Sequence, residues 1–277
     1  MGRLLVIGND AVLAAALRAS HHLDGHEVES CGGPFEATAL LRGRAFDVII
    51  TDPSASASDG LALIEELRHA RPGVRAIVLA PKLSSADVIE ALRQHVYACF
   101  TRPVDYEEVA DMARAAIEDP DWRSAIEVTS GVPYWITLRV SCRLITADRL
   151  TRFMTEYRSD LPSGERDLLM TAFREMLLNA MEHGAGFDPE KVIEVTAAQT
   201  DRAIVFHFRD PGPGFDRNDL KHAAATAHPA DVMSTIAGRA DNGMRPGGFG
   251  MLIVRHIVDE LVYNERGNEV LMIKHLK

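Results

Sequence analysis

Residues 175–184 read Glu-Met-Leu-Leu-Asn-Ala-Met-Glu-His-Gly and end a helix that apolar periodicity predicts over 164–183. Steps of four residues place Glu175, Asn179 and His183 on one face of that helix. Asn179 can supply an oxygen ligand to Mg²⁺. Glu175 can orient or deprotonate a nucleophile near a terminal phosphate. Taken alone, the pattern describes a polar helix face in water equally well.

A short glycine-rich turn follows a predicted strand over 203–209. It reads Asp210-Pro-Gly212-Pro-Gly214. A carboxylate at a strand end can accept a hydrogen bond from an adenine amine, and the two glycines let the backbone approach a ligand closely. The alternative is an ordinary turn rich in proline and glycine.

A second glycine-rich turn opens a helix predicted over 250–261. It reads Arg245-Pro-Gly247-Gly248-Phe-Gly250. Glycines at a helix N-terminus leave free amides and the positive end of the helix dipole for a phosphate. The forked donors of Arg245 can reach terminal phosphates. Each cluster has an ordinary explanation, but three of them in this order and spacing indicate a nucleotide site.

Together the three motifs resemble those of the GHKL (histidine-kinase-like) ATPases. The sequence around the last helix resembles the anti-sigma-factor serine kinases in particular. The resemblance implies an α/β sandwich that binds ATP and Mg²⁺ under a lid over 216–246. It also implies specific roles: Mg²⁺ binding for Asn179, adenine binding for Asp210, the catalytic base for Glu175, and further nucleotide contacts for His183, Gly212, Gly214, Arg245, Gly247, Gly248 and Gly250.

The first half of the chain has a different pattern. Short, wholly apolar runs alternate with amphipathic segments through residues 1–119. This alternation predicts a doubly wound, parallel, five-stranded α/β domain. Acidic residues and a proline at 118–122 favour a linker over 120–130. The ATP-binding domain then covers 131–277.

This first half resembles a response-regulator receiver. Asp52 ends the third predicted strand, where receivers carry the phosphorylated aspartate, and Asp10 lies after the first strand. The resemblance implies that Asp52 accepts a phosphoryl group and that Asp10 and Asp52 bind Mg²⁺. The chain departs from the receiver pattern at Ser56, Ala80, Cys99 and Arg102. Two interpretations stay open: Asp52 is phosphorylated, or it is a leftover acid on a docking domain.

Composition narrows the class of protein. The 277 residues carry a formal net charge of −10, which argues against non-specific binding to nucleic acid or to an anionic membrane surface. The three cysteines form no CxxC motif and read as small core residues. No apolar run approaches the roughly 20 residues of a membrane span. A cytoplasmic protein is therefore expected.

Three functions follow from these observations. The first is a serine/threonine kinase that modifies a small anti-sigma-factor antagonist and binds a sigma factor, with a homodimer left open. The second is an ATP-dependent partner-binding switch with little catalysis, which would use the same residues. The third is a phosphorelay histidine kinase, and the absence of histidine from residues 96–181 counts against it.

Overall fold

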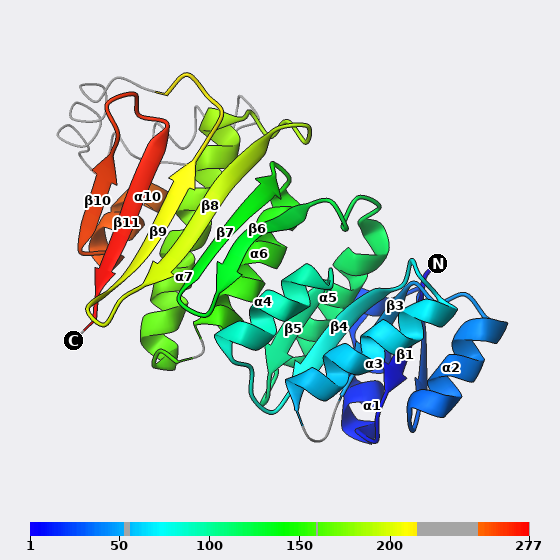
Figure 1. Cartoon of the computed structure of the whole chain (residues 1–277). Coiled ribbons are helices and arrows are strands. Elements are labelled where there is room, and N and C mark those ends of the chain that lie inside the picture. The colour runs from blue at the N-terminus through cyan, green and yellow to red at the C-terminus, as the bar shows by residue number, and fades with distance from the viewer. Residues whose placement is uncertain (53–55, 159, 215–248, 277) are drawn as a thin grey trace. The chain divides into compact units, whose positions relative to one another are not determined.

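The computed structural model describes residues 1–52, 56–158, 160–214 and 249–276 (Figure 1). The chain divides into two compact units. The first contains residues 1–128 and 148–160, and the second contains residues 129–147 and 161–277.

The first unit is built on five parallel strands in the order β2-β1-β3-β4-β5, which confirms the predicted doubly wound sheet. The strands β1, β3 and β4 are buried almost throughout, as their apolar runs predict. The strands are β1 (Arg3–Ile7), β2 (Glu27–Cys31), β3 (Val48–Thr51), β4 (Arg75–Ala80) and β5 (Ala98–Thr101). The helices are α1 (Ala11–Ala19), η1 (His21–Leu23), α2 (Pro34–Gly43), α3 (Ala57–Ala70), α4 (Ser85–Arg93) and α5 (Tyr106–Glu118).

Local chemistry fixes where these helices begin. Asp10 caps α1 by accepting hydrogen bonds from the amides of Val12 and Leu13, each at 2.9 Å. Ser84 and Asp87 form a reciprocal capping box at the start of α4. Since the sheet order reverses between β1 and β3, the residues that follow these strands meet at one edge of the sheet.

Helix α6 (Leu144–Tyr157) is divided between the units, and its residues from Asp148 onward belong to the first. Arg149 is buried there beside the buried Asp119, with 3.6 Å between guanidinium and carboxylate. Its guanidinium also donates to the carbonyl oxygens of Tyr97 (3.2 Å) and Trp122 (3.0 Å). These contacts satisfy a charge that would otherwise be costly to bury.

A second group of contacts joins α6 to β5 and α5. Arg152 lies 4.7 Å from the ring centre of Phe100 and pairs with Glu108 and Glu156. The Thr101 hydroxyl donates to Glu156 at 2.5 Å. This part of α6 therefore packs as a component of the first unit.

The second unit is a six-stranded sheet in the order β10-β11-β9-β8-β7-β6, with helices on one face (Figure 1). Phe173 of helix α7 packs against Phe206 and Phe208 of the sheet, with ring centres 5.0 and 5.3 Å apart. This layering confirms the predicted α/β sandwich. Its elements are β6 (Ile126–Val132, of which the first three residues belong to the first unit), β7 (Trp135–Ser141), α7 (Ser163–Asn179), η2 (Ala180–Gly184), β8 (Val192–Gln199), β9 (Ala203–Arg209), α10 (Phe249–Ile257), β10 (Glu260–Tyr263) and β11 (Glu269–His275).

Some elements differ from the sequence-based expectation. The helix predicted over 250–261 is too long: α10 ends at Ile257, and Glu260–Tyr263 pairs with β11 as a strand. The short run Leu261–Val262 continues the helical spacing of apolar residues, so periodicity alone cannot locate this break. Strand β6 was not predicted and lies partly within the stretch 120–130 that the sequence assigned to a linker.

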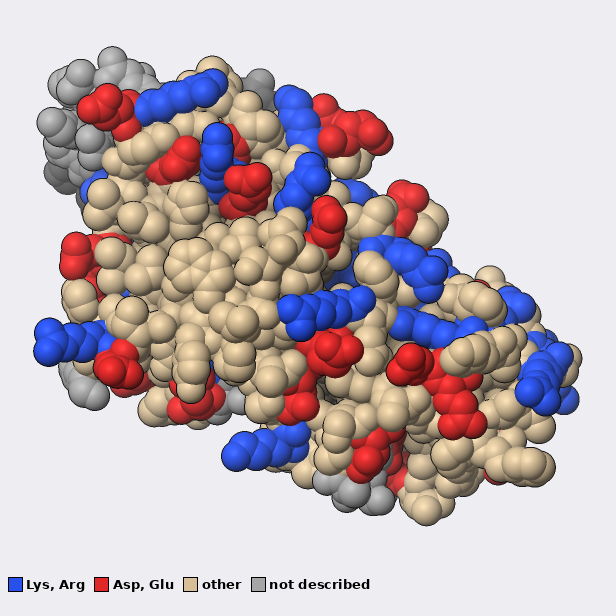
Figure 2. All heavy atoms as spheres, in the orientation of Figure 1, with Lys and Arg blue, Asp and Glu red and all other residues tan. Residues whose placement is uncertain are grey.

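On the other face of the six-stranded sheet, the described side chains are exposed or half-buried. Trp135, Ala198, Val205 and Ile273 form one cross-strand row, on the opposite side from the buried residues of the same strands. Figure 2 shows uncharged groups over the middle of this face, with basic and acidic side chains intermixed around them.

The structure also tests the predictions made for the cysteines and for membrane-spanning helices. Cys31, Cys99 and Cys142 are free and buried, which confirms the core role predicted for them. Among the described residues, no helix is long and apolar enough to cross a membrane.

Candidate nucleotide site

The end of α7 presents the first predicted site residues. Glu175 and Asn179 are half-buried. Regular α-helical geometry ends at Asn179, and residues Ala180–Gly184 form a π turn. His183 lies in this wider turn and is exposed. Single π turns recur at functional positions in helices, and this one begins directly after Asn179.

The turn after β9 presents the second group. The amide of Asp210 donates to the carbonyl oxygen of Asn268 at 3.0 Å, which extends the sheet by one further pair. One oxygen of the Asp210 carboxylate, Oδ1, accepts from the Gly212 amide at 2.8 Å. This bond holds the side chain against its own turn.

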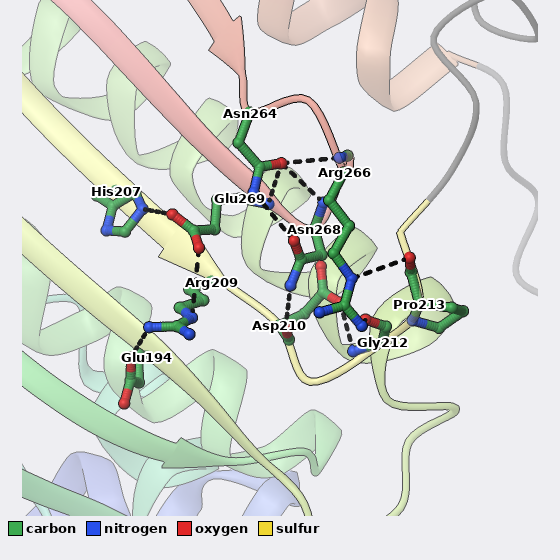
Figure 3. A network of polar contacts seen from close by, with 11 residues as sticks. Glu194, His207, Arg209, Asp210, Gly212, Pro213, Asn264, Arg266, Asn268 and Glu269 are labelled. Carbon is green, nitrogen blue, oxygen red and sulfur yellow. Dashed lines mark hydrogen bonds and ion pairs between the residues drawn. The ribbon is translucent and has the colours of Figure 1, made fainter.

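Two residues of the β10–β11 hairpin secure this turn from the other side (Figure 3). The Arg266 guanidinium donates to the carbonyl oxygens of Gly212 and Pro213, both at 3.2 Å. The Asn268 side-chain amide donates to the Asp210 carbonyl oxygen at 3.1 Å. The backbone of the turn is thus fixed by donors from a segment more than 50 residues downstream.

Asn264 holds the hairpin itself in shape. Its Oδ1 accepts from the amides of Gly267 (2.7 Å), Asn268 (3.1 Å) and Glu269 (3.2 Å). Sequence reasoning missed Asn264, Arg266 and Asn268. The available signal was the turn composition of residues 264–268, Asn-Glu-Arg-Gly-Asn, between two apolar runs.

Close backbone packing brings the end of α7 and the first glycine turn together. A Cβ added to Gly184 would lie 2.2 Å from the Asp210 carboxyl carbon. A Cβ on Gly212 would lie 2.7 Å from the Gly184 carbonyl oxygen. Gly214 has a φ of +82°, and a Cβ there would meet the Arg266 carbonyl oxygen at 1.8 Å. These contacts explain why glycine stands at each position.

The start of α10 lies against Glu175. A Cβ on Gly250 would approach Glu175 Oε2 to 2.3 Å. The structure therefore brings Glu175 to Gly250 and Gly184 to Asp210, so described residues of all three motifs gather at one end of α7. Arg245, Gly247, Gly248 and the lid predicted over 216–246 lie outside the described residues.

The electrostatics of Asp210 suit a ligand. Partial burial raises the pKa of its carboxyl, and the Gly212 amide and the Arg266 guanidinium act in the opposite direction. The Asp210 carboxylate is half-buried at the end of a strand, and the glycines of its turn have no room for a Cβ atom. Such a carboxylate suits a hydrogen bond from an adenine amine. Asn179 offers the hard oxygen that Mg²⁺ prefers.

The residues predicted for the receiver site also meet. Arg102 Nη2 lies 2.8 Å from Asp10 Oδ2 and 2.7 Å from Asp52 Oδ2. Burial raises the pKa of Asp52, whereas hydrogen bonds from Leu13 and Arg102 lower the pKa of Asp10. One guanidinium thus bridges both carboxylates and offsets one of their two negative charges, and a divalent cation would have to compete with it.

Comparison with known proteins agrees with this division. Residues 141–274 match the family model of the histidine kinase-like ATPase domain, and residues 4–114 match the response regulator receiver domain. The chain is therefore a fusion of a receiver domain with a histidine kinase-like ATPase domain.

Curated relatives match the chain over part of their length. Transcriptional regulatory protein GlrR of Escherichia coli (strain K12) is 28% identical over 148 residues, 51% of this chain and 33% of that protein. Virulence transcriptional regulatory protein PhoP of Salmonella typhimurium (strain 14028s) is 31% identical over 114 residues, 41% of this chain and 50% of that protein. The chain thus spans between a third and a half of the length of these two relatives.

Solved structures match part of the chain as well. A response regulator from Thermotoga maritima is 17% identical, with 43% of this chain and 99% of that chain covered and a TM-score of 0.38. A response regulator protein from Burkholderia pseudomallei is 26% identical, with 43% and 70% covered and a TM-score of 0.36.

Proposed function

We propose that this protein is an ATP-dependent serine/threonine kinase that phosphorylates a small anti-sigma-factor antagonist and binds a sigma factor or a similar partner. The observation that carries the proposal is the meeting of Glu175, Gly250, Gly184 and Asp210 at one end of α7. With Asn179, one helical turn after Glu175, this cluster would supply an adenine acceptor, a carboxylate near the phosphates and a magnesium ligand.

Each residue has a distinct role in the proposed reaction. The Asp210 carboxylate accepts from the adenine amine, and Asn179 would hold Mg²⁺, which would supply positive charge next to the phosphates. Glu175 accepts the proton of a serine or threonine hydroxyl on the partner. The hydroxyl oxygen then bonds to the γ-phosphorus while the bond to the β–γ bridging oxygen breaks, and ADP leaves. Positioning and charge stabilisation supply most of the catalysis in such transfers.

Regulation by the receiver domain is part of the proposal. Arg102 contacts the two carboxylates of the receiver site, and the adjacent Thr101 donates to Glu156 of α6. A change at Asp52 that displaces Arg102 would therefore also affect the neighbouring Thr101, and through the Thr101 hydrogen bond it would affect Glu156 of α6. Because α6 begins in the second unit and continues into the first, the helix provides a covalent connection between the two domains.

The test is partner capture with and without ATP and Mg²⁺, followed by mapping of phosphorylated residues on every captured protein. A phosphoserine or phosphothreonine that forms with the wild-type chain and not with Glu175→Ala would support the kinase. Capture that depends on ATP without any phosphate transfer would instead favour the partner-binding switch. A phosphohistidine on the chain itself would favour the phosphorelay enzyme.

A further inference from the structure

A second cluster of ligand-type side chains lies in the first unit, where η1 meets the first turn of α5. The core fixes both backbones. Leu23 anchors η1, and Val109 and Ala110 anchor the beginning of α5, all of them buried. Asp105 caps α5 by accepting from the Glu107 amide at 2.9 Å. Side chains that leave these two segments toward each other therefore start from well-defined positions.

His21, His22 and Glu107 bring three ligand atoms within 4.8 Å of one another. Nδ1 of His21 and Nε2 of His22 each lie 3.8 Å from Oε2 of Glu107. Donor atoms bound to a tetrahedral Zn²⁺ at 2.0–2.2 Å lie roughly 3.3–3.6 Å apart. Small side-chain rotations would therefore bring the three atoms to metal-binding geometry.

Two neighbouring residues orient these ligands. The buried Ser20 hydroxyl donates to Glu107 Oε2 at 2.7 Å and accepts from the His22 amide at 3.3 Å. On the far side of the His22 ring, Nδ1 lies 3.6 Å from Asp111 Oδ1. A carboxylate on the distal nitrogen of a ligating histidine is a usual support of metal sites, because it fixes the tautomer and orientation of the ring.

We propose that His21, His22 and Glu107 form a site for a transition-metal dication of the Zn²⁺ class, with water completing the coordination. Two imidazoles and one carboxylate suit Zn²⁺, whereas Mg²⁺ and Ca²⁺ prefer all-oxygen sites. Such an ion would cross-link η1 to α5. The site uses no residue of the nucleotide cluster, so it stands independently of the proposed kinase activity.

Calorimetric titration of the full chain with Zn²⁺ tests this site, after treatment with a chelator and in the absence of nucleotide. We expect one ion per chain, with an affinity at least about tenfold weaker in His22→Ala and in Glu107→Gln. Two matched controls should bind as the wild type does: His69→Ala removes an exposed histidine of α3, and Glu108→Gln makes the same charge change one residue away. Substitution of Co²⁺ for Zn²⁺ should give the visible absorption of a four-coordinate ion.

Thermal unfolding of the metal-free proteins shows whether each variant is folded. Zinc should raise the Tm of the wild type and of both controls, and should raise the Tm of His22→Ala by less at the same zinc concentration. Equal zinc affinity in wild type and His22→Ala would overturn the proposal, as would the absence of zinc binding by the wild type. Either result would mean that the histidines serve only as ion-pair partners of Glu107 and Asp111.

Discussion

The partly buried position that makes Asp210 a candidate adenine acceptor also has a cost in stability. Its carboxyl is partly withdrawn from water, and this desolvation raises its pKa. A raised pKa means that the folded state holds its proton more tightly than the unfolded chain does. The folded protein is therefore penalised as pH rises from the ordinary value of 3.8 through the raised one, and the penalty persists at neutral pH.

Asp210→Asn should consequently leave the nucleotide-free protein as stable as the wild type, or more stable, at pH 7. The asparagine oxygen can still accept from the Gly212 amide, so the turn keeps its hydrogen bond. The advantage of the variant should shrink as the pH is lowered toward 4. Thermal unfolding of both proteins across this range is the measurement. A variant that is clearly less stable at pH 7 would show that the charge itself stabilises the turn.

Glu175 calls for a different kind of test, because its proposed role appears mainly in the transition state. Glu175→Ala should bind ATP about as well as the wild type and should transfer phosphate about 10²–10⁴-fold more slowly. Single-turnover kinetics with a captured substrate protein would separate binding from chemistry. Transfer at the wild-type rate would reduce Glu175 to a structural residue packed against Gly250.

Arg102 governs the prediction for the receiver site. Because its guanidinium contacts both Asp10 and Asp52, a small phosphodonor with Mg²⁺ should label the wild type weakly or not at all. Arg102→Ala should bind Mg²⁺ more tightly and accept more label at Asp52. Intact-mass measurement gives the extent of labelling, with Asp52→Asn as the control. Full labelling of the wild type, abolished in Asp52→Asn, would contradict this account.

Among the elements, helix α6 contributes a buried ion pair to the first unit. Arg149 and Asp119 are 3% and 0% exposed, so removal of either one takes an oppositely charged neighbour away from a buried charge. Arg149→Met should destabilise the first unit by about 3–5 kcal/mol.

The double variant Arg149→Met/Asp119→Asn should recover a large part of that loss, since it removes both charges. Denaturant unfolding of the wild type, both single variants and the double variant completes the cycle. Strictly additive effects would mean that the pair does not couple α6 to the rest of the first unit.

Comparison of the predicted elements with the observed ones shows how much of the structure the sequence could predict. The apolar runs of β1, β3 and β4 predict a buried parallel sheet, which the structure confirms. The spacing of the motifs predicts Glu175, Asn179 and Asp210 as site residues. The hairpin residues that hold the Asp210 turn could not be found in this way. Arg266 reaches Gly212 across 54 positions, and that contact depends on the pairing of β10 with β11. Neither local propensity nor periodicity contains this information.

The widened turn at the end of α7 is a further case. Steps of four residues predict one continuous face from Glu175 to His183, but the α-helix ends at Asn179. The close packing of Gly184 against Asp210 is a tertiary contact. It is compatible with a wider turn than a regular helix provides, and a helical pattern in the sequence does not show it.

At the scale of the whole molecule, two units of different architecture each carry a polar site. The first holds two carboxylates bridged by one arginine. The second holds the half-buried carboxylate of Asp210 beside Gly184 and Gly212, where a Cβ atom would clash. The central claim is that the second of these sites binds ATP together with Mg²⁺.

Calorimetric titration of the full chain with ATP tests this claim most directly. With Mg²⁺ present, the wild type should bind one ATP, and Asp210→Asn should bind it more weakly by about 1.5–3 kcal/mol, because the adenine amine loses a charged acceptor. Asp201→Asn, in the turn between β8 and β9, is the matched control and should bind as the wild type does. No binding by the wild type, or equal affinity in wild type and Asp210→Asn, would contradict the account.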